Sequence, residues 1–165
     1  MLIKTLRDKF RPVESHLRPF LRALKFIEDQ TLRLEELRQK RASTVEKFFK
    51  TIKNPSEDFI FAIDPFHALI CEEKSYNIVE IENDLGIQDY FLRTLTPEQE
   101  GLFALWKVEQ KDVRDLEEEI IEKSETMSYY KNLILRKSED NTHYHCLGNI
   151  LRISGKIIVV NKIQS

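Results

Sequence analysis

The stretch from residue 96 to residue 137 constrains the fold more than any other part of the chain. Its only proline stands at its second position, and its only glycine, Gly101, falls within the first turn. Apolar residues recur through it at alternating steps of four and three, the period of a helix that packs along one seam. The apolar members of this seam are Leu102, Trp106, Val113, Leu116, Ile120, Met127 and Ile134. Such a helix would extend roughly 60 Å at about 1.5 Å per residue, so it needs a partner helix of similar length.

The residues Thr96-Pro97-Glu98-Gln99 predict where this helix begins. A threonine hydroxyl just before a helix accepts a bond from a free backbone N–H, and a proline at the first helical position loses no helical hydrogen bond. Gln99 stands where the second member of a capping box belongs. Two interpretations of the helix stay open, namely a coiled-coil seam and a long core helix of a bundle.

The natural partner is the region 14–53, which has an apolar face of its own. We expect Pro12 to end a short preceding helix and Pro19 to lie in the first turn of the next one, because an interior proline breaks the backbone ladder. Pro55 follows the end of this helix. The predicted fold is α+β, with a long antiparallel coiled-coil helical hairpin formed by 14–53 and 96–137.

The segment 54–95 contains three short apolar runs. These runs are 59–63, 66–71 and 76–81. The last run alternates as a strand does, and we expect a hairpin between the last two runs that turns at 73–75. The first run is open between a strand and a helix over 56–63, because its start is typical of a helix N-terminus. A short helix over 88–95 is expected to lead into Thr96.

The segment 141–165 predicts a three-stranded β-meander. Gly148-Asn149 and Ser154-Gly155 are two-residue turn signals. The run 157–160 is β-branched throughout, which is typical of a strand buried on both faces. Joined to the strands of 54–95, this meander gives one small antiparallel β-sheet head on a single domain, 1–165.

Charge is distributed unevenly along the chain. The net charge is −2, but 1–53 carries 14 basic against 7 acidic residues and 54–95 carries 2 against 9. The segment 96–140 has a net charge of −5, and 141–165 has +3 with no acidic residue. Segments of opposite charge favour self-complementation or a polyanionic partner.

Seven basic residues fall on the face of the first long helix opposite its apolar side, and we name them the basic stripe. They are Arg18, Arg22, Lys25, Arg33, Lys40, Lys47 and Lys50. Three interpretations stay open: a solvated face, pairing with an acidic surface of another subunit, and binding of nucleic-acid phosphates. The phenylalanines of this helix lie mostly on its core side, so binding would be independent of base sequence.

Composition indicates a chain without a membrane segment or a disulfide framework. Charged residues make up 33% and hydrophobic residues 41%, and there are two cysteines. No apolar run approaches the roughly 18–20 residues of a membrane span, and the first residues lack the apolar run of a signal peptide. We therefore expect a cytoplasmic protein.

No arrangement of residues predicts catalysis. The sequence has no glycine-rich phosphate loop and no nucleophile elbow. His143, His145 and Cys146 cluster, but a structural zinc site needs about four ligands, and only His67 and Cys71 could complete it. We therefore expect ordinary strand residues here, with no metal, no cofactor and no small-molecule substrate.

Arg11 and His16 have an Arg-x4-His spacing, which resembles the motif of the helical HEPN-type ribonucleases. The resemblance covers these two residues alone. Pro12 stands where that family usually has a polar residue, and a proline there argues against a motif on a regular helix.

The sequence thus favours a non-enzymatic assembly or adaptor protein that self-associates, as a homo-oligomer, or binds a protein partner through its long helices. The apolar seam of the second helix is the expected partner-binding surface. The alternative hypothesis is a sequence-independent nucleic-acid-binding or regulatory accessory protein that uses the basic stripe.

Overall fold

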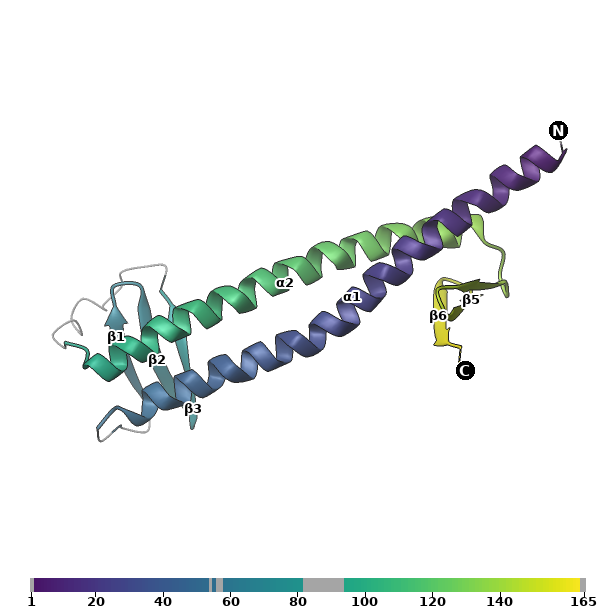
Figure 1. The fold of residues 1–165 in the computed structure, drawn as a ribbon. Helices are drawn as coiled ribbons and strands as arrows, with labels where there is room; N and C mark the ends of the chain where they lie inside the picture. Colours follow the sequence, from purple (N-terminus) through teal and green to yellow (C-terminus); the bar gives the residue numbers. More distant parts are fainter. Residues whose placement is uncertain (1, 54, 56–57, 82–93, 164–165) are drawn as a thin grey trace. The chain divides into compact units, whose positions relative to one another are not determined.

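Two long helices and six short strands form the described part of the chain (Figure 1). The structure is a computed structural model that describes residues 2–53, 55, 58–81 and 94–163, with the side chains of 2–13 outside the description. Helix α1 spans Leu2–Lys50 and helix α2 spans Pro97–Lys137. The strands are β1 (Phe59–Asp64), β2 (His67–Glu72), β3 (Ser75–Glu80), β4 (His143–Cys146), β5 (Asn149–Ser154) and β6 (Ile157–Lys162). The α+β class and the two long helices that pack against each other are as predicted.

Residue contacts divide the chain into two units. The first unit is Met1–Arg33 with Leu116–Ser165, and the second unit is Leu34–Asp115. The first contains the antiparallel sheet β4-β5-β6, and the second contains the antiparallel sheet β1-β2-β3. The prediction of one sheet is therefore wrong. Each set of three strands is joined by its own tight turns and covers its own apolar cluster, so burial requires no pairing between the sets. The single-domain organisation stays a prediction.

In the second unit the sheet packs onto both helices (Figure 1). Phe61 and Leu69 from the sheet meet Phe48 of α1 and Trp106 of α2 in one buried cluster. The rings of Phe48 and Phe61 are edge to face, with centroids 5.7 Å apart. Such an aromatic pair contributes about 0.5–1.5 kcal/mol beyond the area that it buries.

The two helices run antiparallel within the second unit. Arg41 of α1 bonds to Gln110 of α2, and Thr51, just after α1, bonds to Gln99 in the first turn of α2. Residues later in α1 thus contact residues earlier in α2, as in any antiparallel helix pair.

In the first unit the sheet covers a second buried cluster. The cluster consists of Leu17, Phe20, Leu21, Ile134, Leu151 and Ile153. His16 of α1 faces Tyr130 of α2 with ring centroids 5.9 Å apart, and Lys123 lies over the ring of Phe26, so the helices are antiparallel here too. Both clusters therefore combine α1, α2 and one sheet.

The start of α2 confirms the predicted capping box. The N–H of Gln99 donates to Thr96 Oγ1 at 3.2 Å, and the N–H of Thr96 donates to Gln99 Oε1 at 3.0 Å. Pro97 is the first helical residue. Two free N–H groups are thus satisfied by side chains.

Helix α1 begins earlier than predicted. It is continuous from Leu2, so Pro12 does not end a helix and Pro19 does not lie in a first turn. An interior proline removes one backbone hydrogen bond and costs roughly 3 kcal/mol. Leu17 and Phe20 beside Pro19 are 2% and 4% exposed, and burying two such side chains contributes about as much as the proline costs.

The structure decides between the strand and the helix that were both open for the first apolar run of 54–95. The first apolar run is β1, so the helix over 56–63 is wrong, while residues 56–57 lie outside the described residues. Strands β2 and β3 form the predicted hairpin, in which Glu72 pairs with Ser75. The two turn residues, Glu73 and Lys74, have φ of 47° and 67°. The predicted helix over 88–95 falls mostly outside the described residues.

The C-terminal meander is present with its turns shifted by one residue. The turns are Leu147-Gly148 and Gly155-Lys156, because Cys146 pairs with Asn149 and Ser154 with Ile157. Gly148 and Gly155 have φ of 74° and 61°, a conformation that glycine adopts without strain. Strand β6 is not buried on both faces, since its odd-numbered residues are exposed. Only one face of this sheet meets the helices.

Candidate functional site

The predicted seam of α2 lies largely inside the chain. Trp106, Val113 and Ile134 are 2%, 0% and 0% exposed, and Leu116 is 9% exposed. The other three, Leu102, Ile120 and Met127, are half-buried. Trp106 packs with Val45 and Phe48 of α1, and Ile134 packs with Leu17 and Phe20 of α1. At these positions α1 of the same chain occupies the seam, so a second protein would have to bind elsewhere or displace α1.

A polar cluster interrupts the packing of the two helices in the second unit. The hydroxyl of Thr44 donates to Glu109 Oε1, and both side chains are 3% exposed. Arg41 Nη1 donates to Gln110 Oε1 at 2.6 Å. Glu109 Oε2 has no hydrogen-bond partner among the described residues. Buried polar pairs of this kind are suited to setting the register of two helices.

All seven residues of the basic stripe are exposed. Arg18, Arg22, Lys25 and Arg33 belong to the first unit, and Lys40, Lys47 and Lys50 belong to the second. Lys50 Nζ lies 3.2 Å from Glu46 Oε1, a surface pair worth little in stability. The helical period therefore predicted correctly which basic side chains face away from the core.

The outer face of the sheet β4-β5-β6 combines apolar and basic side chains. Ile157 and Val159 of β6 are 62% and 40% exposed, and they are neighbours on this face because alternate residues of a strand share a face. The register sets Arg152 opposite Val159 and His143 opposite Arg152. One face of the sheet is thus covered by the helices. The other face presents Arg152 on the central strand β5 and the apolar pair Ile157 and Val159 on the edge strand β6.

The cluster His143, His145 and Cys146 is divided between the two faces of this sheet. Both histidines are exposed on the outer face, and Cys146 packs against the buried cluster on the inner face. His67 and Cys71 lie in the other sheet. Within the described part of the chain, no three His, Cys, Asp or Glu residues converge as metal ligands.

His67 is the one histidine of the second unit, and the contacts around it give it a structural role. Its Nδ1 lies 2.8 Å from Asp64 Oδ1, and its ring stands edge-on to those of Phe103 and Trp106 at 5.1 and 5.6 Å. The carboxylate thereby fixes a ring that packs against the aromatic cluster.

Only one residue of the Arg-x4-His pair, His16, has a described side chain, and it forms no catalytic arrangement with the described residues. His16 faces Tyr130, and Arg11 lies where side chains are outside the description. Pro12 between them is part of a continuous helix, so its presence does not break α1 as the sequence suggested.

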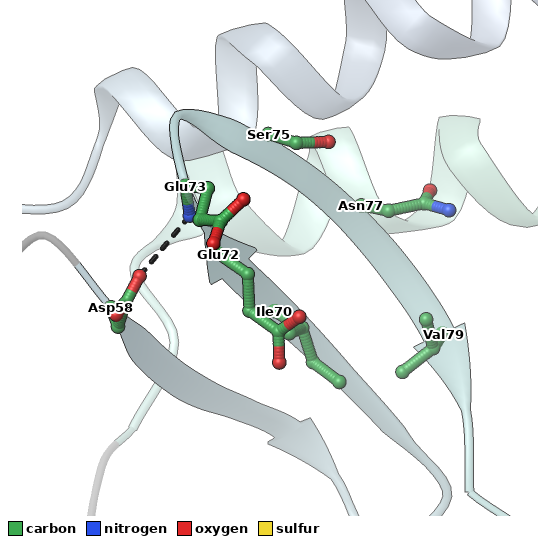
Figure 2. Close-up of a pocket in the computed structure, with 7 residues that line it drawn as sticks. All are labelled: Asp58, Ile70, Glu72, Glu73, Ser75, Asn77 and Val79. Atoms are coloured by element: carbon green, nitrogen blue, oxygen red, sulfur yellow. Dashed lines mark hydrogen bonds between the residues drawn. The ribbon is translucent and has the colours of Figure 1, made fainter.

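Sequence reasoning did not foresee an acidic hollow on the outer face of the sheet β1-β2-β3. Figure 2 shows its lining, which comprises Asp58, Ile70, Glu72, Glu73, Ser75, Asn77 and Val79. Its volume is about 720 Å³, and Asp58 Oδ1 accepts a bond from the N–H of Glu73 at 3.1 Å. The one feature of the sequence that points to this hollow is the net negative charge of 54–95. The lining suits a cationic group but contains no base paired with a nucleophile.

No described helix has a stretch long and apolar enough to cross a membrane. Comparisons of the chain with family models, with curated proteins and with solved structures find no match. The proposals below therefore depend on the geometry and chemistry of the chain itself.

Proposed function

We propose that the chain is a non-enzymatic assembly or adaptor protein of the cytoplasm that binds protein. In this proposal the two long helices form an antiparallel coiled-coil hairpin that serves as the scaffold. The outer face of β4-β5-β6 is the binding surface.

The observation that carries the proposal is the exposure of Ile157 and Val159 on β6, at the edge of that face. Single exposed apolar residues are normal, but neighbouring ones on a regular sheet are typical of contact surfaces. The alternative surface, the α2 seam, is filled by α1 at Trp106 and Ile134. Arg152 of the central strand stands opposite Val159, so the same face carries a basic side chain beside the apolar pair.

A photo-cross-linking residue at position 159 tests this proposal in cells that produce the chain. We expect p-benzoylphenylalanine in place of Val159 to form a covalent adduct with protein. The matched control places it at Ile121 of α2, which belongs to the same unit and is 58% exposed but stands alone. Equal adducts at both positions, or no protein adduct at 159, would overturn the proposal.

A second candidate function is sequence-independent binding of nucleic acid by the basic stripe. It is favoured by the exposure of all seven side chains on a segment with 14 basic and 7 acidic residues. With about three phosphate contacts, affinity for a labelled duplex should fall roughly 40-fold between 50 and 200 mM salt. Reversing Arg22, Arg33 and Lys40 to Glu should abolish the binding. An affinity that survives these changes would exclude the stripe.

A further inference from the structure

The outer edge of β6 carries backbone groups that the sheet leaves available. The N–H of Ile163 donates to the carbonyl of Gly148 at 2.9 Å, so the odd-numbered residues at this strand direct their backbone groups toward β5. Backbone groups alternate in direction along a strand. Those of Ile158, Val160 and Lys162 therefore point to the outer edge, where no described strand pairs with β6.

None of the four edge strands of the two described sheets has a longer regular stretch without a charged residue than β6, whose one charge, Lys162, stands at its last position. Strand β1 has an irregular register between Ala62 and Asp64. Strand β3 ends in Glu80, which lies 2.8 Å from Arg114, and β4 has only 4 residues. Strand β6 has 6 residues in regular register without proline, and its first five residues are uncharged. Bulges, charges and short length are the usual protection of sheet edges against pairing with another strand.

We propose that β6 pairs antiparallel with β6 of a second copy of the chain, so that the two sheets become one continuous sheet. This inference rests on the proposed function and names its partner. Closed pairing of identical strands requires a two-fold axis, and because opposite residues share a face, one residue faces its own copy across that axis. Val159 and Val160 are the two central residues of β6, so the registers with either of them on the axis pair the greatest part of the strand.

Charge selects between these two registers. With Val159 on the axis, Lys156, the turn residue just before β6, would come next to Lys162 of the second copy, and like charges that face each other are destabilising. With Val160 on the axis, Lys162 stands opposite Ile158 of the second copy. Ile157 then meets Ile163, and these two side chains are 62% and 48% exposed in the single chain. The register with Val160 on the axis therefore removes apolar surface from water without opposing like charges.

A hollow beside β6 provides the space that this register needs. Its volume is about 320 Å³, and it lies between α1 and the end of the sheet. The lining comprises Leu21, Leu24, Lys25, Glu28, Asp29, Leu147, Gly148, Asn149, Val160, Lys162 and Ile163. In the proposed register Ile158 of the second copy stands opposite Lys162 on the helix-facing side, so its side chain enters the hollow.

Charge reversal across the axis tests the pairing and the register together. Light scattering of the wild-type chain over a range of concentrations should show a reversible dimer, since one strand pair buries less than the roughly 1,200–2,000 Å² of stable complexes. The double variant Ile157→Lys with Ile163→Lys opposes two lysines and should weaken the dimer at least about 10-fold. The double variant Ile157→Lys with Ile163→Glu sets opposite charges against each other and should restore it.

Both positions are exposed in the single chain, so these variants should fold, and unchanged far-UV circular dichroism would check this. Ile121→Lys on α2 is the matched control and should dimerise like the wild type. A wild type that stays monomeric at every concentration, or a Lys/Lys variant that dimerises normally, overturns the inference. If the Lys/Glu variant does not regain the dimer, the proposed register is overturned. A protein adduct at position 159 that contains a different protein, together with a monomeric wild type, would overturn self-pairing and leave the proposed function standing.

Discussion

The hydroxyl of Thr44 donates a hydrogen bond to the carboxylate of Glu109 across the two helices of the second unit, with both side chains 3% exposed. A pair of this kind is costly to break, because the remaining partner stays buried without its bond. It also distinguishes one alignment of the helices from those shifted along the axis, in which the Thr44 hydroxyl would no longer reach the carboxylate.

Replacing Thr44 with Val should therefore lower the free energy of unfolding by about 1–3 kcal/mol. The double variant Thr44→Val with Glu109→Leu should recover most of this loss, because it leaves no unpaired buried charge. Urea unfolding followed by the fluorescence of Trp106, the only tryptophan, measures both in the second unit. The neighbouring exposed Ser43→Ala is the control. Additive losses in the double variant would show that the two side chains are not coupled.

The capping box predicts a loss confined to the start of α2. Thr96→Ala should destabilise the second unit by about 1 kcal/mol, because the N–H of Gln99 then lacks its acceptor. Thr126→Ala is a suitable control, since that hydroxyl bonds to the Glu122 carbonyl within its own exposed helical turn. If both changes have the same effect, the hydroxyl of Thr96 has no special role.

Pro19 provides a direct test of the continuous first helix. At an interior helical position, alanine restores the missing N–H, so Pro19→Ala should raise the free energy of unfolding by on the order of 1–2 kcal/mol after the greater freedom of the unfolded chain is counted. Thermal unfolding followed at 222 nm measures this. A proline in the first helical turn gives no such gain. Unchanged or lower stability would therefore place the helix start near Pro19.

The turn between β2 and β3 is a site where stability can be increased. Glu73 and Lys74 both have positive φ, a conformation that costs ordinary residues roughly 1–2 kcal/mol each. Replacing them with Asn and Gly, the residues preferred in such turns, should raise the melting temperature by several degrees. Gly155→Ala should have the opposite sign, because its φ is 61°. A lower melting temperature for the Asn-Gly variant would contradict the turn type.

Local signals were sufficient for part of this fold. The capping box, the end of α2 and the hairpin turn after Glu72 each depend on a few adjacent residues, so the sequence predicted them. The basic stripe was also predictable, because the helical period separates exposed from buried positions. Pro19 led to a wrong helix start because burial of Leu17 and Phe20 offsets the local cost of an interior proline.

The rest depends on contacts between distant residues. An apolar run such as 157–160 reads the same whether a strand is covered on one face or two. Likewise, the heptads of α2 do not say whether the helix that fills the seam belongs to the same chain. Whether strands from 59–80 and 143–162 join one sheet is decided by which apolar cluster each covers. The acidic hollow also depends on the register of the sheet, which brings Asp58 to Glu73 and cannot be read from the sequence.

The bond from Gln99 to Thr51 has a consequence for how the second unit opens. The strands β1, β2 and β3 all lie between these two residues in the sequence, so the bond stands at the base of the loop that carries the sheet. The entropy cost of closing a loop grows only slowly with its length, so one contact at the base restricts a long loop at little more cost than a short one. Local opening that breaks this bond should therefore release the whole sheet from that restriction at once.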